Sequence, residues 1–218
     1  IVVEGLRREV DVVVNRVSKV VGIKSGDVVK LITLSAYLHD IGKALSAYQY
    51  EFNKCGKDEG EISLRGHEVY STWVAYWVFD YLKVSNYEPF LAGIILHHSA
   101  RRSLYNALLG FRGVNVSMRD VDTIVGVLRH IDELGLVSDI ENFLTYASAG
   151  LEHNLKTSLK LAVDGILNAI INNQYSKYGE LVTYLISIAD NIDSNMRRSG
   201  KFTPITIRRF LRENSHQQ

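Results

Sequence analysis

Residues 36–44 read Ala-Tyr-Leu-His-Asp-Ile-Gly-Lys-Ala. The imidazole of His39 and the carboxylate of Asp40 are adjacent in an apolar stretch, and Lys43 follows three positions after the carboxylate. Such polar groups are costly to bury unless a partner compensates, and a metal ion is a common partner. If the segment is helical, Lys43 lies one turn beyond both groups and shares a face with them. A buried His–Asp pair explains an isolated dipeptide at least as well, so the decision depends on the rest of the chain.

Further histidines favour the metal interpretation. His67 lies in the run Leu-Arg-Gly-His-Glu, and the pair formed by His97 and His98 follows Ile-Ile-Leu. Asp190 directly follows the run Ile-Ser-Ile-Ala. A metal centre in a helical bundle takes one or two ligands from each of several helices. These positions at the ends of apolar segments therefore predict a shared centre.

The apolar pattern predicts helices almost throughout. Apolar residues recur at intervals of three and four in the segments 3–21, 28–48, 69–82, 90–96, 121–134, 140–147, 155–171 and 181–192. Ser117 followed by Asp120 indicates a capping box, and Gly135 is a typical residue after a helix C-terminus. We expect an all-α domain, with irregular segments at 53–63 and 99–117.

Composition is that of a compact globular protein. Its 218 residues fit one domain over 1–218, with 199–218 as a possible basic appendage, and its net charge is only +1. The single cysteine, Cys55, excludes an intramolecular disulfide and fits a reducing cytoplasm. No apolar run approaches the roughly 20 residues of a membrane span, and charged residues begin at Glu4, unlike a signal peptide. We therefore expect a cytoplasmic protein without a membrane partner.

The ordered motifs resemble the HD metallo-phosphohydrolase superfamily. The resemblance is closer to the CRISPR-associated HD nuclease of type I interference systems, in its stand-alone form without a fused helicase. It covers about 31–198 and rests on Leu-His-Asp-Ile-Gly-Lys (38–43), Arg-Gly-His-Glu-x-x-Ser (65–71), His-His (97–98) and Ala-Asp-x-x-x-Ser (189–194). Each motif is weak alone, but the ordered set is specific. The resemblance implies an HD-domain helical bundle around a metal centre.

The resemblance also implies two divalent ions bridged by one carboxylate. One ion would be held by His39, Asp40 and Asp190, and the second by Asp40, His67, His97 and His98. Asp40 and Lys43 would be catalytic, Lys43 by stabilising a phosphate oxygen or protonating the leaving oxygen. Ser194 would contact phosphate. Imidazole-rich ligation favours Mn, Fe, Co, Ni or Zn over Mg, although cellular supply also decides which ion is used.

The chain departs from the superfamily pattern in its N-terminal helix. Members usually place another histidine there, whereas no histidine precedes His39 in this sequence. Gly5-Leu6 is the best match for that position. We expect the first ion either to be one ligand short, with water in its place, or to take a ligand upstream of Ile1.

Basic residues gather after the histidine pair and near the C-terminus. Arg101 and Arg102 follow the pair closely. The second cluster comprises Arg197, Arg198, Lys201, Arg208, Arg209 and Arg212. These side chains could guide a phosphate backbone to the metals. The C-terminal cluster could equally dock a helicase subunit.

Three functions remain open from the sequence. We expect first a nuclease that cuts single-stranded DNA in CRISPR interference, with a separate helicase and effector complex. The alternative is an HD-type phosphohydrolase of nucleotides or cyclic dinucleotides. The related HD-GYP enzymes follow their histidine pair with Glu and a Gly-Tyr-Pro segment, whereas this pair is followed by Ser99-Ala100-Arg101-Arg102. A non-catalytic module that keeps a metal for stability is the third.

Overall fold

The computed structural model describes residues 2–55, 66–97 and 113–198, with side chains over 10–51, 66–97 and 113–190. Every regular element among these residues is a helix, so the predicted all-α fold is confirmed. The apolar side chains of the described segments pack into one continuous core.

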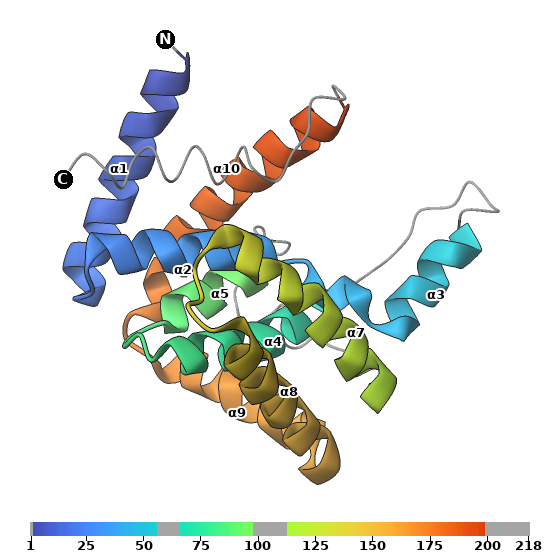
Figure 1. The fold of residues 1–218 in the computed structure, drawn as a ribbon. Coiled ribbons are helices and arrows are strands. Elements are labelled where there is room, and N and C mark those ends of the chain that lie inside the picture. The colour runs from blue at the N-terminus through green and yellow to red at the C-terminus, as the bar shows by residue number, and fades with distance from the viewer. Residues whose placement is uncertain (1, 56–65, 98–112, 199–218) are drawn as a thin grey trace.

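The helices follow one another with short connections (Figure 1). The α-helices are α1 (Val2–Val21), α2 (Ser25–Leu38), α3 (Ser46–Cys55), α4 (His67–Leu82), α5 (Glu88–His97), α7 (Met118–Leu128), α8 (Ile140–Thr157), α9 (Leu159–Asn172) and α10 (Gly179–Arg198). Three short 3-10 helices lie between them: η1 (Ile41–Ala44), η2 (Arg129–Leu134) and η3 (Ser176–Tyr178).

Helices α4 and α5 form the centre of the bundle. Helix α4 contacts η1, α2, α5, α8 and α9, and α5 also packs along α10. Residues 89–95 of α5 are all buried, as are residues 67–75 of α4. Because these helices are covered on all sides, they lack the apolar stripe of a surface helix. Helix α1 and the end of α10 extend away from the central body in Figure 1.

A polar anchor joins α4 to α8 inside this apolar core. The indole N–H groups of Trp73 and Trp77 both donate to Oδ1 of Asn154, each at 2.9 Å. A Cβ at Gly150 would clash with the ring of Trp77, so α8 approaches α4 closely only because this residue is glycine. A buried amide oxygen with two donors is satisfied, which is what burial of a polar group requires.

The prediction of one continuous helical segment over 28–48 is wrong, because the structure divides it between two α-helices. Helix α2 ends at Leu38, and Asp40 takes φ −109° and ψ 0°, outside the helical region. The backbone then forms η1 before α3 begins at Ser46. Apolar periodicity runs through this break because both sides of it are buried, and so the pattern did not reveal it. His39 still has helical backbone angles and donates its N–H to the Ser35 carbonyl at 2.9 Å, so the chain leaves the helical register at Asp40.

Asp120 fixes the far side of this break. Its side chain is only 2% exposed, and its carboxylate accepts the Ser46 N–H at 2.7 Å and the Ser117 N–H at 2.7 Å. The predicted capping box of Ser117 and Asp120 is thereby confirmed. Burial by itself raises the pKa of Asp120, but the hydrogen bonds from Ser117 and Ser46 outweigh it and hold this pKa below its ordinary value. The start of α3 is therefore attached to the start of α7.

Candidate metal centre

A close backbone contact brings the His-Asp turn to the start of α4. A Cβ at Gly42 would clash with the carbonyl oxygen of His67, so only glycine permits this approach. The Gly42 N–H donates to Oγ of Ser71 at 2.9 Å. Gly42 and Ser71 therefore act together, and their contact places the residues before Gly42 beside the first residue of α4.

The carboxylate of Asp40 contacts two other polar side chains in this region. Its Oδ1 lies 3.2 Å from Nε2 of His67 and 2.7 Å from Nζ of Lys43. Lys43 was expected one helical turn beyond Asp40, and η1 provides that turn through a Lys43 N–H to Asp40 carbonyl bond of 2.9 Å. The carboxylate thus joins a buried imidazole to an ammonium group.

Tyr48 covers the inner side of His67. Its buried ring packs edge-on to the imidazole, with ring centroids 6.3 Å apart. Burial raises the pKa of Tyr48 above its ordinary value, and Tyr70 and Glu68 raise it further. Burial therefore favours the neutral hydroxyl, and the ring of Tyr48 forms a wall beside His67.

Helices α5 and α10 build the opposite region of the centre by close packing. A Cβ at Gly93 would lie 2.5 Å from Cγ1 of Val182, and the Thr183 hydroxyl donates to the Gly93 carbonyl at 3.1 Å. One turn further along both helices, Nδ1 of His97 lies 3.1 Å from Oγ of Ser187. Small residues at this crossing therefore allow the last turn of α5 to reach α10.

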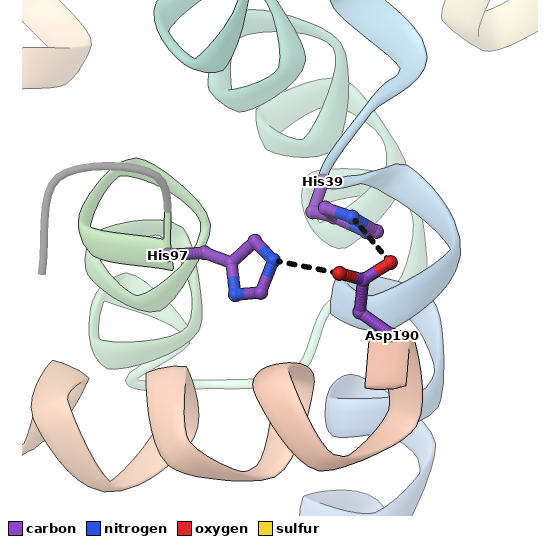
Figure 2. A group of neighbouring side chains, drawn as sticks. All are labelled: His39, His97 and Asp190. Carbon is purple, nitrogen blue, oxygen red and sulfur yellow. Dashed lines mark ion pairs between the residues drawn. The ribbon is translucent and has the colours of Figure 1, made fainter. Parts of the chain in front are cut away.

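His39, His97 and Asp190 converge from three helices, as Figure 2 shows. Asp190 Oδ2 lies 3.7 Å from His97 Nε2, and Asp190 Oδ1 lies 3.9 Å from His39 Nε2. Two atoms that bind one ion at about 2.1 Å lie roughly 3.0–4.2 Å apart, depending on the angle between the bonds. These separations, and the chemistry of two imidazoles with a carboxylate, fit a divalent transition metal.

The Nδ1 atoms of His39 and His97, on the far side of each ring from Asp190, also have contacts of their own. His39 Nδ1 lies 2.8 Å from the Ala36 carbonyl, which can only accept, so in the neutral ring Nδ1 carries the proton. Nε2 then presents its lone pair toward Asp190, and it also lies 3.6 Å from Oδ2 of Asp40. The tautomer required of a metal ligand is thus set by the backbone of α2.

The structure brings together six of the residues proposed from sequence: His39, Asp40, Lys43, His67, His97 and Asp190. From sequence His97 was placed with His67, and the structure shows that it also lies with His39 and Asp190. The packing of α5 on α10 brings His97 to Asp190. His98, Arg101 and Arg102 lie outside the described residues, as does the side chain of Ser194.

Two contacting side chains received no role from sequence reasoning. Ser187 lies three positions before Asp190 and so shares its face of α10, which is a signal that spacing could have given. Glu68 is adjacent to His67, and its Oε2 lies 3.4 Å from Nδ1 of that histidine. From sequence, Glu68 was included only as part of the motif at 65–71.

An all-α fold with histidines and aspartates gathered from several helices defines an HD-type metal centre. Comparison with known families finds a match to the family described as "Cas3, HD domain" over residues 2–197. The chain belongs to this family, which places it among the CRISPR-associated metal-dependent nucleases and phosphohydrolases of the HD superfamily. No curated protein and no solved structure matches the chain. Within the described segments, no helix has the length and apolar character needed to cross a membrane.

Proposed function

We propose that the chain is a nuclease that cuts single-stranded DNA in CRISPR interference, together with a separate helicase and an effector complex. The observation that carries this proposal is the convergence of His39, His97 and Asp190 beside Asp40, His67 and Lys43. Family membership supports the CRISPR setting, and the donor set supports metal-dependent hydrolysis.

The proposed ligands form two groups that share Asp40. His39, Asp40, His97 and Asp190 would hold one ion, and Asp40, His67 and His98 would contribute to the other. When bound, such ions lower the pKa of water and neutralise charge that builds on a phosphodiester. Mn, Fe, Co, Ni and Mg are the candidates, with imidazole donors favouring the transition metals.

The exposure of these side chains supports access by a polymer. The carboxylates of Asp40 and Asp190 are 38% and 40% exposed, whereas the imidazoles of His39 and His97 are 10% and 7% exposed. The carboxylates therefore face solvent above a layer of buried imidazoles. A phosphodiester can therefore approach these carboxylates from solvent.

Lys43 would act on the phosphate directly. Its ammonium group lies 2.7 Å from Asp40, beside the proposed ligands. From there Nζ can donate a hydrogen bond to a non-bridging phosphate oxygen, or a proton to the leaving oxygen. We further propose that Ser194, Arg101 and Arg102 contact the DNA backbone.

The proposal is tested by cleavage of matched substrates with Mn²⁺. We expect single-stranded DNA to be degraded, and intact duplex and cyclic dinucleotides to react poorly. Asp40→Ala should lower the cleavage rate by about 100-fold or more, because both groups of ligands lose their shared carboxylate. His130→Ala is the control, since that side chain is 66% exposed and lies in η2.

Near-normal cleavage by Asp40→Ala, with helical circular dichroism retained, would refute the two-ion centre. Rapid turnover of cyclic dinucleotides or nucleoside triphosphates, without cleavage of DNA, would instead identify a small-molecule phosphohydrolase.

A further inference from the structure

Glu68 is a buried carboxylate at the second position of α4. The residue is 8% exposed, and its neighbour His67 is 5% exposed. Burying a carboxylate is costly unless hydrogen-bond donors surround it. Oε2 of Glu68 accepts the Gly66 N–H at 3.0 Å, and the same oxygen lies 3.4 Å from Nδ1 of His67.

Capping of the helix explains only part of this arrangement. Gly66 has φ 94° and no side chain, so the turn before α4 uses the Glu68 carboxylate as its acceptor. Negative charge in the first turn also favours the helix dipole. Neither role requires Oε2 of Glu68 to lie beside Nδ1 of His67. A Glu68 side chain turned toward solvent would avoid that contact.

The imidazole of His67 is held between two carboxylates. Its Nδ1 faces Glu68, while its Nε2 lies 3.2 Å from Oδ1 of Asp40. Without an ion, the carboxylate of Asp40 can only accept, so the hydrogen bond at Nε2 requires a proton on that nitrogen. When an ion binds at Nε2, the proton must stand on Nδ1, where Glu68 can accept it. The edge of the Tyr48 ring limits movement of the imidazole on a further side.

We propose that Glu68 is a positioning residue for the metal centre. When an ion is bound at Nε2, the carboxylate of Glu68 accepts the Nδ1–H of His67 and thereby holds the ring with Nε2 toward the side of Asp40. Contacts of this kind are longer in sites without bound substrate or metal and tighten on loading. The inference rests on the proposed role of His67 as a ligand.

The first measurement uses protein loaded with diamagnetic Zn²⁺ and NMR of ¹⁵N-labelled histidine. In the wild-type protein the His67 signals, identified by their loss in His67→Ala, should show a hydrogen-bonded Nδ1–H that exchanges slowly with water. In Glu68→Ala this Nδ1–H should exchange too fast to be observed. Glu141→Ala is the matched control, because Glu141 is also the second residue of its helix, α8, and is paired with Arg129 and not with a histidine.

The second measurement is Mn²⁺ binding by calorimetry. Glu68→Ala should weaken the site that His67 serves by about 10- to 100-fold, as loss of an orienting partner usually does. Glu68→Gln keeps a neutral acceptor of the same size. It should retain the Nδ1–H signal of His67 and the fold, and weaken binding by about three- to tenfold. A role limited to capping predicts a lower melting temperature for Glu68→Ala with the Nδ1–H signal and the Mn²⁺ affinity unchanged.

The inference is overturned if Glu68→Ala keeps the slowly exchanging Nδ1–H of His67, or if both Glu68 variants bind Mn²⁺ as wild type does. If Glu68→Ala does not fold, unchanged Mn²⁺ affinity in Glu68→Gln is sufficient to overturn the inference. Failure of the proposed function is a separate result, because His67→Ala would then leave Mn²⁺ binding intact.

Discussion

The two regions of the metal centre are built in different ways. The Asp40 region comprises Asp40, Lys43 and His67, and its contacts to Asp40 measure 2.7 and 3.2 Å. The Asp190 region comprises His39, His97 and Asp190, and the distances from its carboxylate to the two imidazoles are 3.7 and 3.9 Å. In the Asp40 region, the carboxylate already contacts the imidazole of His67 and the ammonium group of Lys43. The Asp190 region has the spacing of groups that share an ion.

This difference has a consequence for binding. In the Asp40 region an incoming ion competes with Lys43 for the same carboxylate oxygen, whereas at Asp190 both imidazole nitrogens already stand at ligand-to-ligand distances. We therefore expect unequal metal affinities, with the Asp190 region binding first. The backbone contacts that support the regions differ as well, because Gly42 meets backbone and Gly93 meets a side chain.

The largest expected effect comes from Gly42→Ala. The new methyl group would meet the His67 carbonyl, which is part of α4 and has little freedom to move. We expect a loss of about 3 kcal/mol or more of unfolding free energy, as for other overpacked buried sites. Gly93→Ala should be milder, about 1–3 kcal/mol, because Cγ1 of Val182 can rotate away and only a small shift of α10 is needed to relieve its Cβ at 2.8 Å and the Thr183 nitrogen at 3.3 Å. Urea unfolding measures both.

Gly126→Ala is the control for this pair. No atom lies within 4 Å of a Cβ at that position of α7, so alanine should stabilise the helix by about 0.5–1 kcal/mol. Equal losses for Gly42→Ala and Gly93→Ala would show that the two regions are supported with equal rigidity.

Lys43→Met tests the competition for Asp40. Removing the ammonium group frees the carboxylate oxygen that now lies 2.7 Å from Nζ and also removes a nearby positive charge. Mn²⁺ affinity should therefore rise several-fold, while cleavage of single-stranded DNA falls by about 10- to 100-fold as a proton or hydrogen-bond donor is lost. Calorimetry and single-turnover cleavage report the two effects. A fall in both quantities would mean that Lys43 supports the fold of the site and does not compete with the ion.

Asp120→Asn probes the attachment of the Asp40 region to α7. The carboxylate accepts hydrogen bonds from Ser46 and Ser117, and the substitution should remove about 1–3 kcal/mol of unfolding free energy at neutral pH. Because the pKa of Asp120 is lower in the folded protein, this stability is present above the unfolded pKa near 4. It is lost as the pH falls through the folded value.

Urea unfolding at several pH values distinguishes this residue from the other carboxylates. The difference in stability between wild type and Asp120→Asn should shrink toward low pH. A constant difference from pH 7 to pH 3 would contradict the assigned role of the charged carboxylate.

Local sequence determined much of the fold and the identity of the candidate ligands. The three- and four-residue periodicity predicted the helices, and the capping box of Ser117 and Asp120 is a contact three residues apart. His67 stands at the start of α4 and His97 at the end of α5, as their places beside apolar runs indicated. These features are readable because each depends on neighbours within one or two turns of the chain.

Only the tertiary structure decided how those ligands are grouped. The break after Leu38 exists because Gly42 packs against His67, a residue on another helix that periodicity cannot report. His97 lies beside Asp190 because small residues let α5 and α10 cross closely. The tertiary structure likewise decided the chemical roles of Glu68 and Ser187, because each role depends on the histidine ring nitrogen beside which the side chain lies. Sequence spacing gives the face of a helix, but the distance between faces depends on how the helices pack.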